Sequence, residues 1–191
     1  GALLILAAAA LLAYNKWDAA RADKAAQQAL GELEQTLTTT VEEKAKSETV
    51  VLQPELDPAQ PMTETELDGW SYIGYLSIPS IGLDLPVMSE WSYPRLKIAP
   101  CRQFGSSRTD DLVIAAHNYE SHFGKLTSLT AGDSVTFTDM DGIVNEYVVN
   151  KVEVLDPHSV EEVEHSGYAL VLYTCTYGGK TRVTVFCDRA S

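Results

Sequence analysis

One cysteine, one histidine and one arginine in this chain have the chemistry that acyl transfer by nucleophilic catalysis needs. Cys175 ends one apolar run, His117 ends another, and Arg182 lies a short way after the cysteine. A nearby histidine can draw a cysteine to its thiolate, which is the nucleophilic form. A cation beside them would favour that thiolate and could stabilise the oxyanion of an acyl-transfer intermediate. The three residues could therefore form one reaction centre.

Residues 170–188 predict two short strands joined by a tight turn. Residues 170–173 are apolar and partly β-branched, as in a buried strand, so Cys175 is expected near the rim where that strand leaves the core. Gly178-Gly179 supplies positive φ without steric cost, and residues 182–186 then alternate as a returning strand should. We expect Arg182 to begin that strand, across the turn from Cys175.

Residues 112–116 predict a second buried strand, which ends at His117. A lone Cys175 could simply be a small buried hydrophobe, which is the commoner fate of a free cysteine. The second segment favours catalysis instead, because the imidazole and the thiol meet if the two strands are neighbours.

Short β-like runs separated by turn residues fill the chain from residue 69 onward. Many short strands with few helices predict a closed or nearly closed β-barrel. The expected pieces are a hairpin (70–78 and 83–88, around 79–82), a helical turn (93–98), a short helix (122–129) and strands at 135–138 and 146–154.

The chain resembles a sortase, one of the cysteine transpeptidases of Gram-positive cell surfaces. The matching pieces are VIAAHN, which carries the histidine, LVLYTC, which carries the cysteine, and TRVTVF, which carries the arginine. The resemblance covers residues 72–189, and the order of the segments also fits. It implies a mainly β fold, a closed barrel of about eight strands with short helices and a preceding N-terminal helix, of a class B-like or D-like subclass.

The resemblance also implies a reaction. Cys175 would cleave an LPXTG-like sorting signal at the C-terminus of a secreted protein, and an amine of a peptidoglycan precursor or a pilin would open the resulting thioester. His117 would transfer the protons. Arg182, with a backbone N–H near Thr174 or Cys175, would hold the oxyanion and the peptide, which makes Thr174 a predicted substrate-binding position. The alternatives are a cysteine hydrolase and a non-catalytic surface β-barrel binding module.

No cofactor is implied, and no metal-ligand spacing stands out in the sequence. Some sortases bind calcium through acidic loop residues, but Glu161, Glu162 and Glu164 lie at spacings that fit an exposed helical turn equally well. The acidic balance, 27 Asp+Glu against 14 Lys+Arg, argues against a nucleic-acid partner.

The uncharged apolar run 1–14 is interpreted as the remnant of a transmembrane anchor, with Tyr14 and Trp17 at the membrane interface. The run is too short to span a bilayer alone, since a helix needs ~20 apolar residues. A signal-peptide core and a buried core helix are the alternatives. The resemblance implies a single-pass protein of the cell membrane with its catalytic domain extracytoplasmic.

Residues 15–68 are predicted to form a helical stalk and an acidic linker, followed by the catalytic barrel at 69–191. Leu30, Leu33 and Leu37 form an apolar stripe that could pack on the domain, pair with a second copy or do little. The helical pattern is expected to end at 38–40, and the prolines between 42 and 68 predict an extended linker.

The remaining histidines and cysteines are expected to lie outside the reaction centre. His122, His158 and His165 are expected at the surface, because no partner cysteine or ligand spacing accompanies them. Cys101 and Cys187 could form a disulfide or remain two spare thiols. Strand alternation places Cys187 on the face opposite Arg182, so it should not share the site.

Overall fold

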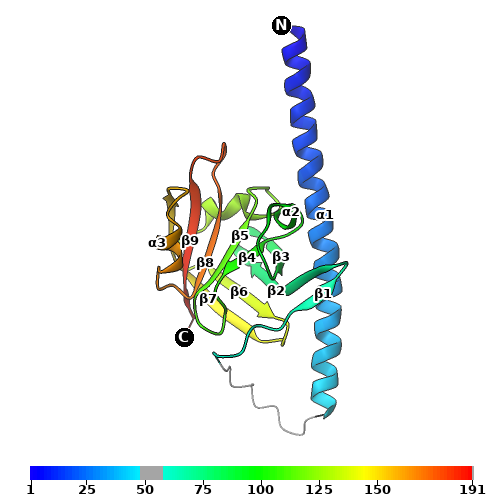
Figure 1. The fold of residues 1–191 in the computed structure, drawn as a ribbon, viewed down its shortest axis with the longest axis vertical. Helices are drawn as coiled ribbons and strands as arrows, with labels where there is room; N and C mark the ends of the chain where they lie inside the picture. Colours follow the sequence, from blue (N-terminus) through cyan, green and yellow to red (C-terminus); the bar gives the residue numbers. More distant parts are fainter. Residues whose placement is uncertain (48–57, 191) are drawn as a thin grey trace.

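Eight strands close into a barrel that is flanked by one long helix (Figure 1). The computed structural model describes residues 1–47 and 58–190, and the side chains of 1–40 and 58–190. The strands are β1 (Thr65–Leu67), β2 (Trp70–Ile78), β3 (Leu83–Met88), β4 (Cys101–Phe104), β5 (Leu112–Ala116), β6 (Ser134–Asp139), β7 (Val144–Leu155), β8 (Leu170–Cys175) and β9 (Arg182–Arg189). The helical elements are α1 (Ala2–Ser47), α2 (Tyr93–Leu96), α3 (Val160–Glu164) and the 3₁₀ turns η1 (Pro79–Ile81) and η2 (Phe123–Ser128).

The barrel closes because β6 pairs back onto β2. Its strands follow the order β2-β3-β4-β5-β8-β9-β7-β6, and the short β1 extends the sheet beside the start of β2. The predicted fold class is therefore confirmed. The first hairpin has the predicted bounds, whereas the segment expected as a short helix at 122–129 is the 3₁₀ turn η2.

Closure requires a glycine at position 74. Gly74 lies opposite Asp139 in the β2–β6 pairing and has φ +149°. A Cβ atom there would come 2.1 Å from the carbonyl oxygen of Thr138, which is far inside van der Waals contact. The absence of a side chain therefore lets the first strand of the barrel approach β6 closely enough to pair.

Helix α1 packs along the outer face of the barrel. Its buried positions share one side of the helix, and Gln27 donates from Nε2 to the carbonyl oxygen of Asp84 on β3 at 3.2 Å. Leu33 and Leu37 lie in one cluster with outward-facing apolar residues of the first barrel strands, including Met88. Of the three outcomes left open for the leucine stripe, the structure shows packing on the domain. The buried positions of α1 are Ala22, Ala26, Leu30, Leu33 and Leu37.

The expected end of the helical pattern at 38–40 is wrong, because α1 continues to Ser47. The hydroxyls of Thr38, Thr39 and Thr40 each donate to the backbone carbonyl four residues earlier, at 2.8 to 2.9 Å. Bonded in this way, a threonine fits inside a helix instead of ending it. Residues 48–57 of the predicted linker lie outside the described residues.

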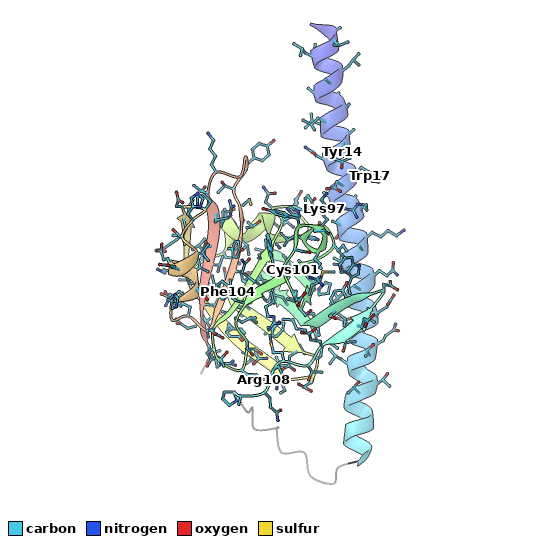
Figure 2. The ribbon with its side chains drawn as sticks, viewed as in Figure 1. Tyr14, Trp17, Lys97, Cys101, Phe104 and Arg108 are labelled. Carbon is cyan, nitrogen blue, oxygen red and sulfur yellow. The ribbon has the colours of Figure 1, made fainter. Side chains whose placement is uncertain are left out.

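The N-terminal part of α1 projects beyond the barrel (Figure 1). Its leucines and Ile5 are 60 to 81% exposed, so it is not the buried core helix that was one alternative. An 18-residue window of α1 has a mean hydropathy of 1.3 and is 0% buried, which makes the helix long and apolar enough to cross a membrane. The rings of Tyr14 and Trp17 lie 6.0 Å apart on this projecting part (Figure 2).

The surface position expected for His122 is wrong. His122 is 0% exposed, and its ring meets that of Tyr119 edge-on with the centroids 5.4 Å apart. Burial, reinforced by the like charge of His117, lowers the pKa of His122 to about 4. The buried His122 is therefore neutral at pH 7. His158 and His165 are exposed, as expected.

This burial predicts a loss of stability in acid. Between the unfolded pKa of 6.5 and about 4, the unfolded chain binds the His122 proton and the folded chain does not. The free energy of unfolding should fall as pH decreases through this window, by roughly 3 to 4 kcal/mol at most and by about 2 kcal/mol between pH 7 and pH 5, since a tenfold difference in proton affinity is worth ~1.4 kcal/mol. Urea unfolding at pH 7 and pH 5 measures this change in the free energy of unfolding.

The substitution His122→Phe should reduce the dependence of the free energy of unfolding on pH, and the exposed control His158→Phe should not. The same dependence on pH in the wild type and both variants would contradict this explanation.

Candidate active site

The three strands that carry the predicted catalytic residues are neighbours in the barrel. β8 lies between β5, to which it is parallel, and β9, to which it is antiparallel. Ala116 faces Thr174 in the first pairing, so the next residues, His117 and Cys175, leave adjacent strand ends together. In the second pairing Cys175 lies directly opposite Arg182. Because neighbouring strands are about 4.8 Å apart, the thiol position has the histidine on one side and the arginine on the other.

Strand alternation sends these three side chains to the same face of the sheet. Leu172 and Val183 point into the barrel core, so Cys175 and Arg182, at odd offsets from them, point outward. His117 follows the inward-facing Ala116 and is likewise on the outer side. The three residues are half-buried, as groups at the edge of a solvent-accessible site should be.

Thr174 lies on the opposite face from Cys175. Its side chain is 3% exposed, and its hydroxyl donates to the carbonyl oxygen of Ala116 at 2.8 Å. This bond ties the ends of β5 and β8 together from inside the barrel. The side chain of Thr174 is therefore not brought to the outer face, and the substrate-binding role predicted near it rests on a backbone N–H.

The loop after β5 turns tightly behind His117. The backbone N–H of Phe123 donates to the carbonyl oxygen of His117 at 3.1 Å, and that of Gly124 donates to Tyr119 at 2.8 Å. A Cβ atom on Gly124 would come within 2.7 Å of the Tyr119 carbonyl oxygen and 2.8 Å of that of Asn118. The glycine lets η2 close over the loop and fix the position of the histidine.

Burial lowers the pKa of His117. The carboxylate of Asp18 in α1 opposes this effect and the ammonium of Lys97 reinforces it. The imidazole is therefore mostly neutral at pH 7, the state in which it can accept a proton.

The turn between β8 and β9 holds the arginine. Gly178 and Gly179 have φ of 86° and 74°, which confirms the positive values expected of them. Nη1 of Arg182 donates to the carbonyl oxygens of Gly179 at 3.0 Å and Thr181 at 3.1 Å. The guanidinium is thus fixed to the turn that links it to Cys175.

A cavity of about 190 Å³ begins at Arg182 and lies over the outer faces of β8 and β9. Tyr173 and Thr184 line it, and they share the face of Cys175 and Arg182 one pleat further along the strands. Residues of β4, the end of β7 and α3 add apolar walls, and Asp156, in the segment between β7 and α3, adds a carboxylate. These further lining residues include Phe104, Leu155, Asp156 and Val163. Sequence reasoning missed the cavity, although Tyr173 and Thr184 could have been found from the alternation.

The other two cysteines are free thiols, so of the two outcomes expected for Cys101 and Cys187 the structure shows the unbridged one. Both are 0% exposed, and burial raises the pKa of each to about 12. Cys187 is in the barrel core and Cys101 is in the outer cluster under α1, which places them on opposite sides of the sheet. Cys175 is the cysteine that solvent reaches.

Among the described side chains, those of 1–40 and 58–190, no group of three or more His, Cys, Asp or Glu could hold a metal ion. The glutamates weighed as calcium ligands, Glu161, Glu162 and Glu164, are exposed on the helical turn α3.

Comparisons with known proteins agree with this architecture. Sortase A of Bacillus anthracis is 29% identical over 120 residues, which is 60% of this chain and 57% of that protein, so the match spans little more than half of its length. Sortase C of Streptococcus pneumoniae has a TM-score of 0.62 at 23% identity, covering 86% of this chain and 97% of that one. A sortase D5 transpeptidase of Clostridium perfringens has a TM-score of 0.65 at 18% identity, covering 88% and 99%.

The two solved structures share the fold, and the match at the level of sequence extends over most of the barrel. The family model described as a sortase domain matches residues 76–190, which contain β5, β8, β9 and the cavity beside them. The chain belongs to the sortase family.

Proposed function

We propose that this protein is a cysteine transpeptidase that uses Cys175 as the nucleophile, His117 as the proton carrier and Arg182 as the oxyanion ligand. The observation that carries the proposal is the register of β5, β8 and β9, in which Cys175 lies between the positions of the other two. Membership of the sortase family supports the same reaction class.

The first half-reaction forms a thioester. Neutral His117 takes the proton of the Cys175 thiol, and the resulting thiolate attacks a backbone carbonyl carbon of the sorting signal, whose oxygen becomes an oxyanion. Arg182 donates to it together with a backbone N–H near Thr174 or Cys175. Since Nη1 is engaged with the turn, the donors toward the substrate are Nε and Nη2. The C–N bond then breaks, and the His117 imidazolium protonates the departing amine.

The second half-reaction transfers the acyl group to an amine. The incoming amine attacks the thioester carbonyl, neutral His117 takes its proton, and the C–S bond breaks to release the Cys175 thiolate. The burial of His117, which favours the neutral imidazole, supports its role as the base in this step. The acceptor is an amine of a peptidoglycan precursor or of a pilin lysine.

The cavity next to Arg182 is the proposed binding site for the sorting signal. An extended LPXTG-like peptide presents apolar side chains, and Leu155, Val163 and Phe104 provide apolar walls for them. Arg182 lies at the end of the cavity and Cys175 opposite it on β8, so a peptide in the cavity would bring its scissile carbonyl to the thiol.

The projecting part of α1 supports a membrane location. Exposed apolar residues followed by an aromatic pair, here Tyr14 and Trp17, are typical of a helix that enters a bilayer through its interface. We propose a single-pass protein of the cell membrane with the barrel on the extracytoplasmic side, where its substrates would be secreted proteins.

The proposal predicts an amine adduct rather than a hydrolysis product. The protein is incubated with a panel of fluorescent LPXTG peptides and single-position variants, with triglycine or a lysine amide added, and the products are separated by chromatography. Amine adduct should exceed free acid for at least one peptide. Cys175→Ala should abolish both products, and His117→Ala should lower the rate by at least ~10²-fold, since proton transfer by a positioned side chain contributes that much. Free acid without amine adduct would show that the protein is a cysteine hydrolase. If no peptide of the panel gave a product, the transpeptidase proposal would fail in favour of a non-catalytic binding module.

The thiols predict a second, substrate-free result. Only the thiolate reacts with iodoacetamide, and a pKa of about 12 leaves about one part in ten thousand of Cys101 and Cys187 ionised at pH 8. Peptide mapping after brief labelling should find Cys175 modified and the other two untouched until the protein is unfolded. His117→Ala should slow the labelling of Cys175. Equal labelling of all three cysteines, unchanged by that substitution, would contradict the proposal that His117 activates the Cys175 thiol.

A further inference from the structure

We propose that Asp18 of α1 is a positioning residue for the active site, acting through Tyr119 on His117; this inference rests on the proposed function. The hydroxyl of Tyr119 donates to Oδ2 of Asp18 at 2.6 Å, across 101 residues of sequence. The ring of Tyr119 in turn lies against that of His117, with the centroids 4.9 Å apart. The N-terminal helix therefore reaches the proton carrier by two direct contacts.

The contact between Asp18 and Tyr119 has the features of a strong hydrogen bond. Its length lies in the ~2.5–2.7 Å range of an O–H donor on a carboxylate, where such bonds are about twice as strong as neutral ones. The side chain of Asp18 is only 16% exposed, and its other oxygen, Oδ1, accepts from Arg21 at 3.0 Å. Both carboxylate oxygens are thus engaged, which fixes the direction in which Asp18 faces Tyr119.

The ring of Tyr119 is held between two histidine rings, so the position that Asp18 gives to Tyr119 also affects His117. The tyrosine ring meets the fully buried His122 edge-on on one side and His117 at 42° on the other. With its hydroxyl fixed by Asp18, the tyrosine forms a rigid wall behind the imidazole. This wall limits the positions that the imidazole can take at the end of β5.

The negative charge of Asp18 favours the protonated form of His117, the imidazolium. From α1 come Asp18 and its partner Arg21; the ammonium of Lys97 faces the histidine from the segment after α2 and has the opposite effect. His122, on the same loop, is neutral at pH 7, and β8 and β9 bring the Cys175 thiol and the Arg182 guanidinium. Removing the Asp18 charge should therefore lower the pKa of His117 further and reduce the imidazolium available to protonate the leaving amine.

The same turn of α1 connects the site to the projecting apolar segment. Trp17 directly precedes Asp18, and Figure 2 shows Tyr14 and Trp17 where α1 emerges beyond the barrel, with Lys97 at the adjoining edge of the domain. A shift of α1 along its axis would displace Asp18 and, through the hydrogen bond, Tyr119. The position of the N-terminal helix is thus coupled to that of the catalytic histidine.

The test compares Asp18→Asn with two variants of matched chemistry. Asp18→Glu keeps the charge, and Asp23→Asn removes a carboxylate further along the same helix without touching Tyr119. NMR of isotope-labelled histidines, assigned with His117→Ala, gives the titration of His117 in each protein. We expect the pKa of His117 to fall in Asp18→Asn, to return toward the wild-type value in Asp18→Glu and to stay unchanged in Asp23→Asn. The proposal is overturned if Asp18→Asn titrates like wild type or like Asp23→Asn.

Transfer kinetics give the second readout. Asp18→Asn and Tyr119→Phe should each lower kcat by roughly ten- to a hundredfold with little change in KM, since a 1 Å misplacement of a catalytic group can cost ~10²-fold. Because the two residues act as one unit, the double variant should lose no more than the worse single one; losses that multiply would contradict the coupling. If the wild-type protein transfers no peptide at all, the proposed function fails, while the NMR titration still decides the role of Asp18.

Discussion

The pairing of β8 with β5 on one side and β9 on the other is the constraint on which the rest of the site depends. Inward apolar residues such as Leu172 fix the face of each strand, and a slip of one residue would turn Cys175 into the core. The bond from Thr174 to Ala116 locks the parallel pair, and the turn carbonyls that hold Arg182 lock the antiparallel one. The three residues of the proposed reaction are therefore placed by backbone register, and the closed barrel keeps that register.

Helix α1 has two structural roles that meet at the site. Its small and aliphatic residues cover outward-facing apolar groups of the first barrel strands, so those strands are apolar on both faces. One turn nearer the N-terminus, Asp18 extends the same packing into a polar contact with the loop that carries His117. The helix thus packs on the barrel along most of its buried length and, in the proposed mechanism, orients His117 at one end.

The sequence predicted what depends on local pattern and missed what depends on contacts across the chain. The hairpin at 70–88, the Gly178-Gly179 turn and the barrel class followed from alternation and glycine chemistry, and the three strand-end residues followed from where apolar runs stop. His122 was misplaced because contacts distant in sequence help to bury it: Ala22 of α1 lies against its ring, which also meets the ring of Tyr119. The Asp18–Tyr119 bond joins residues 101 positions apart, and no local pattern announces it. The cavity beside Arg182 likewise draws on five separate elements, β4, β7, α3, β8 and β9.

The central claim is that one sulfur, flanked by an imidazole and a guanidinium, becomes the acyl carrier. Intact-protein mass spectrometry after exposure to sorting-signal peptides without an added amine tests it most directly, with peptide mapping to locate the modified residue. The account predicts an added mass equal to the peptide acyl group, located on Cys175, and discharged when an amine is supplied. An adduct on Cys101 or Cys187, or one on Cys175 that persists after addition of an amine, would contradict it.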